Sequence, residues 1–171
     1  MKKNFGYIYN EHLPKTMDKK KNLTSFTILE LKNEIAKDNK SALKNFWLKI
    51  EKTGTPLIEP IEGDNNHKLV TFIVQADNDT KNAVVICSLA DQDDILSNNI
   101  CERIENTDIL YRSFVVLNGT RTVYTISKNN SLRFNRFYDN LMDNWDTLSP
   151  DPFNPKEFTQ RYRREGKSFV E

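Results

Sequence analysis

The chain has few of the residues from which catalytic and metal sites are usually built. Its 171 residues include only two histidines, two cysteines and five glycines. His12 lies in a polar N-terminal stretch and His67 follows Asp64 and Asn65 at an expected turn, so both are interpreted as exposed polar residues. A serine nucleophile needs a histidine base, and in α/β-hydrolases it lies in a Gly-x-Ser-x-Gly turn that this sequence lacks. The chain by itself is therefore not expected to be an enzyme.

The scarcity of cysteine argues against a disulfide framework and against a zinc site. Cys87 and Cys101 lie in apolar or mixed strand-like runs, where cytosolic cysteines usually act as small buried hydrophobic residues. Paired ligands at the spacing of zinc sites are missing, so neither a metal nor a cofactor is expected. Reduced, buried thiols are the prediction, and a disulfide between the two cysteines is the alternative.

Long apolar runs and an excess of charge of one sign are missing as well. No stretch of about 18 apolar residues is present, so no membrane span is expected. The positive start Met1-Lys2-Lys3 is followed by polar residues, unlike a secretory signal. Lysine and arginine total 25 and aspartate and glutamate total 24, so nucleic acid is not an expected partner. The prediction is a cytoplasmic protein that binds neither membrane nor nucleic acid.

What the chain does have is an amphipathic segment of expected helices before the strands, which we call the helical front. Residues 1–25 are lysine-rich and unpatterned, which predicts a flexible basic arm. Helical spacing begins near Thr27, and Ser41 is a candidate N-cap for a second helix. This second helix is predicted to end at Gly54, before an extended prolyl segment over residues 55–60. Its apolar stripe comprises Leu43, Phe46, Trp47 and Ile50. A helix with so apolar a face must dock on the domain that follows.

From Lys68 the apolar period changes to two, which is typical of half-buried strands. A polar loop is predicted over residues 91–99. Asn118-Gly119 is a strong hairpin signal because both residues tolerate positive φ, and it predicts that the strands on either side pair antiparallel. Several strands joined by turns predict a mainly β fold, an antiparallel sandwich. The predicted strands cover residues 69–76, 83–89, 100–104, 109–117 and 120–127.

A second helical stripe follows the strands. Ser131 is a candidate N-cap for it, and an irregular aromatic loop is the alternative. Residues 149–155 contain three prolines and break regular structure. Residues 156–171 are charged and are interpreted as a linker toward a further domain, so the main domain is placed over residues 26–155. The stripe comprises Phe134, Phe137, Tyr138, Leu141, Met142 and Trp145.

Recognition residues are the remaining candidates for a function. Arg103, Arg112 and Arg121 lie on or near predicted strands, close in sequence to Tyr111 and Tyr124. Arginine beside an aromatic surface holds flat anions through charge-assisted hydrogen bonds and stacking. An exposed sheet face with ordinary cross-strand pairs is the alternative interpretation.

Several short motifs also follow one another in an order that is typical of one known family. The first comprises Phe46-Trp47, Gly54 to Glu59 and Val70 to Phe72, and the others are Arg103 with Thr107, Asp108 and Tyr111, then Arg121 with Tyr124, then Asp151 to Pro155. In this order they resemble the N-terminal domain of enterochelin (ferric enterobactin) esterases. The last three resemble that family's R-x-x-x-T-D-x-x-Y, R-x-x-Y and D-P-x-N-P segments. The resemblance runs from about Phe46 to Pro155.

The resemblance implies an immunoglobulin-like sandwich that precedes an α/β-hydrolase domain with a Ser-His-Asp type triad in the same polypeptide. The whole enzyme of that family is a cytoplasmic serine ester hydrolase. It hydrolyses the ester bonds of imported ferric catecholate siderophores, so iron would enter only as part of the substrate. No catalytic residue can be carried over, because the positions of the catalytic motifs are not in this sequence.

If the substrate is the ferric catecholate siderophore that the resemblance implies, the residues expected to contact it are Arg103, Arg121, Tyr124 and Trp145. A different class of function is a structural module, whose helical front and aromatic stripe pack on the catalytic domain or on a second copy in a homodimer. A carbohydrate-binding sandwich is a third interpretation. It would need a planar row of exposed aromatic residues, which the strands do not clearly supply.

Overall fold

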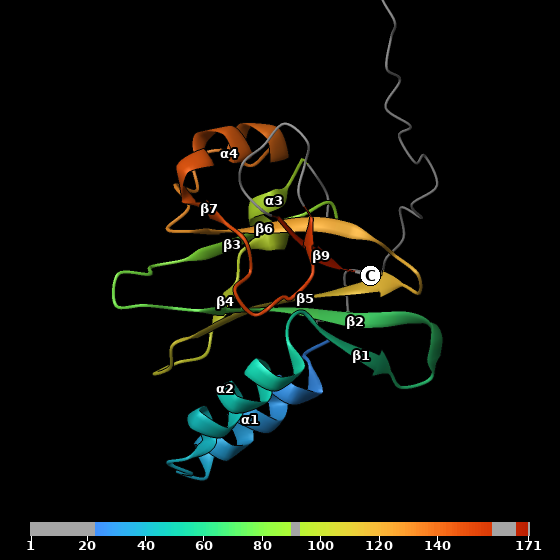
Figure 1. Cartoon of the computed structure of the whole chain (residues 1–171), viewed down its shortest axis with the longest axis vertical. Coiled ribbons are helices and arrows are strands. Elements are labelled where there is room, and N and C mark those ends of the chain that lie inside the picture. The colour runs from blue at the N-terminus through green and yellow to red at the C-terminus, as the bar shows by residue number, and fades with distance from the viewer. Residues whose placement is uncertain (1–22, 90–92, 159–166, 171) are drawn as a thin grey trace, which may run out of the picture.

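The computed structural model describes residues 23–89, 93–158 and 167–170 of the chain (Figure 1). Most of the predicted basic arm, including His12, therefore lies outside the described residues. None of the described helices is long and apolar enough to cross a membrane.

Two helices open the described chain, as the apolar spacing predicts: α1 (Phe26–Ala36) and α2 (Ala42–Thr53). The side chain of Ser25 is fully buried and caps α1 by accepting a hydrogen bond from a backbone N–H of the first turn. Ser41 precedes α2 as predicted, but its hydroxyl donates to Asn39 Oδ1 at 2.8 Å and does not cap the helix. The end of α2 at Gly54, whose φ is +76°, is confirmed.

The strands form two antiparallel sheets, with the orders β1-β2-β5-β4 and β3-β6-β9-β8, and β7 also pairs with β6. The first sheet consists of β1 (Leu57–Ile61), β2 (Asp64–Gln75), β4 (Glu102–Arg103) and β5 (Ile109–Leu117). The second consists of β3 (Ala83–Ile86), β6 (Thr122–Lys128), β7 (Leu148–Ser149), β8 (Glu157–Phe158) and β9 (Lys167–Val170). Each of the five predicted strands overlaps an observed one, and β1 occupies the extended prolyl segment.

Four layers follow from these elements (Figure 1): the α1–α2 pair, the first sheet, the second sheet, and the helices α3 (Ile95–Asn99) and α4 (Phe137–Asp143). The period of two along β2 decides which side chain enters which layer. Phe72 lies in the core between the sheets, whereas Ile73 packs on the helices. The inter-sheet core includes Val70, Phe72, Val74, Val85, Leu110, Phe114, Tyr124 and Ile126.

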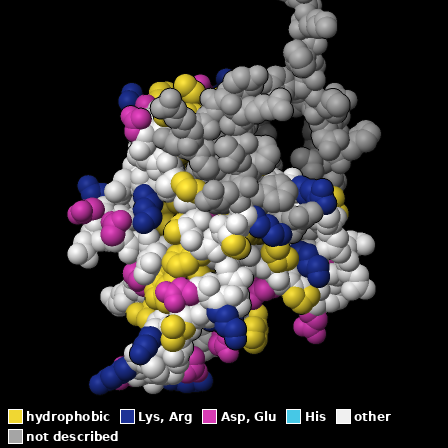
Figure 2. Space-filling model, viewed as in Figure 1, with side chains coloured by type: hydrophobic (Ala, Val, Ile, Leu, Met, Phe, Trp, Pro, Cys, Tyr) yellow, Lys and Arg dark blue, Asp and Glu magenta, His cyan; other side chains and the backbone are white. Residues whose placement is uncertain are grey.

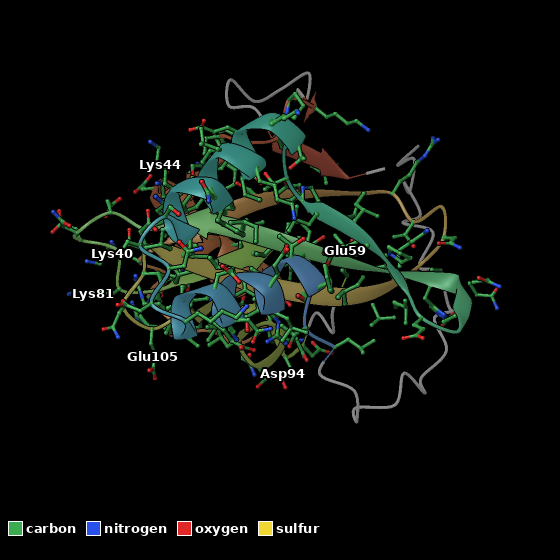
Figure 3. The ribbon with its side chains drawn as sticks, turned by 90° about the horizontal axis from the view of Figure 1, so that it is seen from below. Lys40, Lys44, Glu59, Lys81, Asp94 and Glu105 are labelled. Atoms are coloured by element: carbon green, nitrogen blue, oxygen red, sulfur yellow. The ribbon has the colours of Figure 1, made fainter. Side chains whose placement is uncertain are left out.

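A carboxylate on the edge strand β1 binds the helix pair that covers the first sheet, and Figure 3 shows Glu59 beside the helices. Glu59 Oε1 accepts hydrogen bonds from both the backbone N–H and the hydroxyl of Thr27, at 3.0 and 2.8 Å. Thr27 lies in the first turn of α1, where a negative charge is favourable beside the free N–H groups of a helix. The sequence predicts that the two helices dock on the β domain, and both apolar packing and hydrogen bonds hold them there.

The predicted hairpin at Asn118-Gly119 is wrong. β5 pairs with β2 and β4, whereas β6 belongs to the second sheet, so this turn carries the chain from one sheet to the other. Of its two central residues only Gly119 has a positive φ, of +79°, and Thr120 N–H donates to Leu117 O at 3.1 Å. This geometry fits a type II turn, which splays the flanking strands, and not the type I′ turn of a two-residue hairpin.

Three further predictions are corrected at their limits. α4 starts at Phe137, with Arg136 and not Ser131 before it, so the aromatic stripe is helical only in its middle. Helix α3 occupies the second half of the predicted polar loop. The strands β8 and β9 lie within residues 156–171, so this stretch is not wholly a linker. That a further domain follows it stays a prediction.

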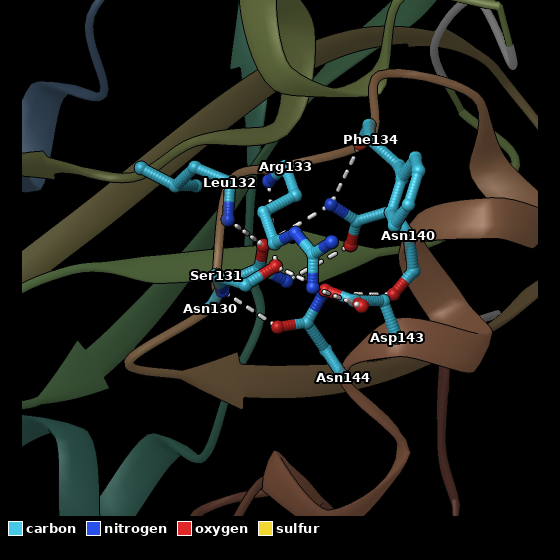
Figure 4. A network of polar contacts seen from close by, with 8 residues as sticks. All are labelled: Asn130, Ser131, Leu132, Arg133, Phe134, Asn140, Asp143 and Asn144. Atoms are coloured by element: carbon cyan, nitrogen blue, oxygen red, sulfur yellow. Dashed lines mark hydrogen bonds and ion pairs between the residues drawn. The ribbon is translucent and has the colours of Figure 1, made fainter.

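A network of buried amides fixes α4 on the second sheet (Figure 4). The Nδ2 of Asn130 and the Nδ2 of Asn140 each donate to the other's Oδ1, at 2.9 and 3.1 Å. Asn144 Oδ1 accepts from Ser131 N–H at 2.6 Å. The three asparagines are at most 3% exposed. A buried polar group without a partner costs about 1–3 kcal/mol, so these amides fix the position of α4 more narrowly than apolar packing would.

The two cysteines are buried free thiols, as predicted. Burial raises the pKa of Cys87 to about 11 and that of Cys101 to about 12, so both are protonated at neutral pH. Cys101 N–H donates to the carbonyl of Ala83, which precedes Cys87 by four residues. Four residues of extended chain span about 13 Å, and a disulfide needs Cα atoms within about 7 Å. The geometry therefore does not suit the alternative disulfide.

We expect Gly54→Ala to destabilise the chain more than the matched control Gly63→Ala. Gly54 has φ +76° and ψ 179°, a conformation that almost only glycine adopts, and an added Cβ would lie 3.1 Å from Phe153 O. Gly63 also has a positive φ, of +74°, but its Cβ would meet nothing within 4 Å. The expected loss of unfolding free energy is about 1 kcal/mol for Gly63→Ala and about 3 kcal/mol for Gly54→Ala. Urea unfolding measures both, and equal losses would contradict the role given to the close approach.

Candidate functional site

The segment after α2 and the segment after β7 meet at a cluster of four buried polar side chains, the Asp151 cluster: Thr55, Tyr124, Asp151 and Asn154. The Thr55 hydroxyl and the Tyr124 hydroxyl both donate to Asp151 Oδ2, at 2.7 and 2.8 Å. Phe153 N–H donates to the other carboxylate oxygen at 3.0 Å. Asn154 Nδ2 donates to the Tyr124 oxygen at 2.9 Å. All four side chains are at most 7% exposed.

The cluster joins parts of the chain that are far apart in sequence. Thr55 and Asp151 are separated by 96 residues, and Tyr124 comes from the middle of β6, in the inter-sheet core. The backbone repeats the connection, because Thr55 N–H donates to Phe153 O at 3.2 Å. The Phe153 ring stacks on Trp47 of α2 with 5.4 Å between ring centroids. The cluster therefore clamps the helical front to the second sheet.

A second set of polar contacts ties α2 and the β2–β3 connection to the β4–β5 turn. Asp108 accepts hydrogen bonds from Trp47 Nε1 and Gln75 Nε2, both at 3.0 Å. Arg103 donates to the backbone carbonyls of Thr80 and Thr107, at 2.6 and 3.3 Å. These residues belong to the arginine–threonine–aspartate motif of the sequence, and the fold uses them for internal contacts.

The tyrosine of that motif lies between a lysine and a carboxylate. The Tyr111 hydroxyl accepts from Lys32 Nζ at 2.9 Å and donates to Glu102 Oε2 at 2.8 Å. Burial is the main cause that raises the pKa of Tyr111, so the phenol is neutral at physiological pH. Arg112 lies 4.0 Å from Glu102, and its guanidinium is 5.8 Å from the centroid of the Phe114 ring. The set connects α1 to the edge of the first sheet.

Tyr124 and Trp145, two of the predicted substrate contacts, lie on opposite faces of the second sheet. Tyr124 is 1% exposed between the two sheets. Trp145 lies in the 3₁₀ turn Trp145–Thr147 and packs on the outer face, against a cluster that contains Val84 and Leu141. The structure therefore does not bring these two side chains together.

The two predicted arginines are also far apart. Arg103 is exposed and bonds to Thr80, close to the end of the second sheet where Ala83 pairs with Lys128. Arg121 is exposed at the other end of β6, seven residues before Lys128. Seven residues of strand span about 20 Å, so the two arginines lie toward opposite ends of the second sheet. The role of each residue in binding stays a prediction.

The described surface also contains a polar hollow. A hollow of about 520 Å³ lies between the β2–β3 connection and the end of β6, and its lining residues are Asn78, Asp79, Lys81, Asn82, Asn129 and Asn130. Lys81 N–H donates to Asn129 Oδ1 and Asn82 Nδ2 donates to the backbone carbonyl of Asn130, whereas the buried Asn82 Oδ1 has no hydrogen-bond partner among the described residues. Within the described residues, no group of three His, Cys, Asp or Glu is placed to hold a metal ion. On the face shown in Figure 2, positive and negative side chains are interspersed, without a broad area of one sign.

The sequence alone does not predict the Asp151 cluster. It presents Asp151 and Asn154 as part of one motif, Thr55 as part of another, and Tyr124 as an expected substrate contact. The available signal was the concentration of Asp, Asn and Pro after the last helix, because such residues need specific partners once they are buried.

Neither a family model nor a curated protein sequence matches the chain. Solved structures do match. The enterobactin esterase FES from Shigella flexneri, in the presence of enterobactin, aligns with a TM-score of 0.58 and 13% identity over 75% of this chain and 34% of that chain. The same enzyme in the presence of 2,3-dihydroxy-N-benzoyl-serine gives 0.57 and 14%, over 73% and 34%. The ferric enterobactin esterase of Salmonella typhimurium gives 0.51 and 17%, over 75% and 36%.

This chain has the fold of part of an enterobactin esterase. It spans about a third of the length of the esterases that it matches. The likeness that the motifs predict is therefore present in three dimensions. The motif residues lie at the contacts that hold the layers together, since Thr55, Tyr124 and Asp151 meet in one cluster.

We expect the Asp151 cluster to be a large, coupled contribution to stability. Tyr124→Phe and Thr55→Val each remove one donor from the same buried carboxylate oxygen. Each is expected to lower the unfolding free energy by about 1–3 kcal/mol. The two losses should not be additive, with a coupling of about 0.5–3 kcal/mol in a double-mutant cycle measured by urea unfolding.

The matched control is Tyr138→Phe, which removes a hydroxyl from a ring on α4 that is 61% exposed. It should change the unfolding free energy by no more than about 0.5 kcal/mol. If Tyr124→Phe is as mild as the control, the hydroxyl does not serve the carboxylate as described.

Proposed function

We propose that this chain is the non-catalytic N-terminal domain of a siderophore esterase, an immunoglobulin-like sandwich that accompanies an α/β-hydrolase domain. The main support is the similarity in fold to the enterobactin esterase, which covers about three quarters of this chain and about a third of the esterase. Two antiparallel sheets around one apolar core, with a turn that crosses between them, agree with such a sandwich.

The composition of the chain supports a role without chemistry of its own. The sequence holds two histidines, and a Gly-x-Ser-x-Gly turn is absent from it. His67 Nδ1 lies 2.7 Å from Asp64 Oδ2 at the start of β2, where the pair supports a turn. The parent enzyme would be a cytoplasmic serine ester hydrolase that releases iron from ferric catecholates such as ferric enterobactin.

Within such an enzyme the domain would assist substrate binding through Arg121. Ferric catecholates are anionic and flat-faced, and guanidinium groups suit such surfaces. Arg121 is exposed at the start of β6, whereas Tyr124 is enclosed by the Asp151 cluster. Among the four sequence candidates, Arg121 is therefore the contact that we favour.

The whole chain is expected to bind ferric enterobactin and to leave its ester bonds intact. Quenching of Trp47 and Trp145 fluorescence measures the binding, and chromatography of the incubated siderophore measures hydrolysis. Arg121→Ala should weaken binding about 10- to 100-fold, because a charge-assisted hydrogen bond contributes about 1.5–3 kcal/mol.

Arg136→Ala is the matched control. The Arg136 side chain is 75% exposed and lies directly before α4, away from the start of β6. It should bind like the parent chain. Hydrolysis by the chain alone would refute the non-catalytic role. Equal binding by parent, Arg121→Ala and Arg136→Ala would refute the contact at Arg121.

A second candidate function is a packing module, and the apolar surface around α4 favours it. Four large apolar side chains there are 38–65% exposed: Leu132, Phe134, Tyr138 and Met142. Large contiguous apolar patches are rare on the surfaces of monomeric proteins. Such a surface would pack on the catalytic domain or on a second copy. A carbohydrate-binding role lacks comparable support, because on strands β1 to β7 the exposed large apolar residues, Ile58 and Leu117, are aliphatic.

Light scattering of the chain tests the homodimer. We expect a mass that rises with concentration for the parent chain and stays at the monomer value for Met142→Glu, since a charge in an apolar interface is unfavourable. Glu62→Gln, on the exposed β1–β2 turn, is the control and should behave like the parent. A parent chain that is monomeric at all concentrations would contradict the dimer.

A further inference from the structure

One sequence signal remains without a role once the predicted hairpin is discarded. Asn118-Gly119 is the only Asn-Gly pair among the 171 residues. It forms the centre of the turn that crosses from the first sheet to the second. Both residues are exposed.

The surroundings of this pair leave room for the backbone to move. A Cβ placed on Gly119 would meet nothing within 4 Å. The Gly119 N–H donates to no carbonyl among the described residues, whereas Asn118 N–H donates to Asn66 O at 2.8 Å. The Asn118 side chain is held by one contact, in which Nδ2 donates to Asn65 O at 2.6 Å. Glycine also lacks the side chain that would hinder approach of its nitrogen to a neighbouring amide carbon.

We infer that Asn118 is a site of spontaneous deamidation. The Gly119 nitrogen gives up its proton to water or hydroxide and bonds to Asn118 Cγ, while the Cγ–Nδ2 bond breaks and ammonia leaves. Water then opens the resulting cyclic imide at either carbonyl, which yields aspartate or β-linked isoaspartate. No oxidant, metal or second enzyme is needed, because the reaction is a substitution followed by hydrolysis.

A second asparagine supplies an internal comparison. Asn130-Ser131 is also followed by a small residue, but Asn130 is 3% exposed and exchanges hydrogen bonds with Asn140. The attacking nitrogen would be Ser131 N, and it donates to Asn144 Oδ1 at 2.6 Å. Folding therefore protects Asn130 and leaves Asn118 open to reaction.

The product would loosen the connection between the sheets. A carboxylate at Asn118 cannot donate to Asn65 O and would face that carbonyl oxygen as a second acceptor. A β-linkage would add one backbone atom to a turn whose i to i+3 bond joins Thr120 to Leu117. The formal net charge of +1 would fall by one unit. This inference does not depend on the proposed function.

The test is peptide mapping by mass spectrometry of the purified chain during incubation at mildly alkaline pH, folded and in urea. In the folded chain, the peptide that contains Asn118 should gain one mass unit before the peptides that contain the other described asparagines. Part of its product should be isoaspartate. Asn118→Gln should abolish the gain at that peptide. In urea, the Asn130 peptide should begin to react as well, because its protecting contacts are lost.

Two outcomes would overturn the inference. One is a folded chain in which Asn118 stays intact while the same peptide reacts in urea, since the turn would then protect the residue. The other is a gain at Asn130 that equals or exceeds the gain at Asn118 in the folded chain. Asn118→Asp gives a second readout, because its urea midpoint should be lower than that of Asn118→Gln.

Discussion

The rest of the structure depends on satisfying one buried carboxylate. Asp151 is 3% exposed, and removing a carboxylate from water is costly unless hydrogen-bond donors replace the water. Its donors include Thr55 and Tyr124, from two distant parts of the chain, and a backbone N–H two residues further on. A fold that buried Asp151 without Thr55 and Tyr124 would lose two of these donors. The helical front, the second sheet and the proline-rich segment must therefore be assembled together, although apolar packing between them is unspecific.

Local features of the sequence predicted the elements well. The apolar residues that follow Thr27 and those around Phe46 are spaced on one side of a helix, so a helical period could be read without knowledge of the partner surface. The same holds for β5, whose predicted and observed limits are both Ile109–Leu117. The pairing of the strands could not be read in this way. Asn118-Gly119 permits both a hairpin turn and a type II turn, and β2 and β4 already flank β5, so the neighbours decide and not the turn residues.

The candidate site was less predictable, because polar residues acquire their roles through distant partners. A tyrosine next to arginines in sequence suggests an anion-binding surface. In the fold, the pleat sends Tyr124 into the core, where Asp151 is 27 residues away along the chain. The two arginines are separated in the same way, since Arg103 and Arg121 lie toward opposite ends of the second sheet. Sequence proximity could not reveal either separation.

Buried polar contacts also explain why short motifs resemble the esterases although identity to the matched structures is only 13–17%. One apolar side chain can replace another of similar volume at modest cost, so the core constrains sequence weakly. Removing one member of a buried polar cluster leaves its partners without hydrogen bonds, which lowers the stability of the fold by more. Motifs built from Gly54, Thr55, Asp108, Tyr124 and Asp151 therefore identify a fold. They do not by themselves identify a substrate, and the function must be argued from exposed residues such as Arg121.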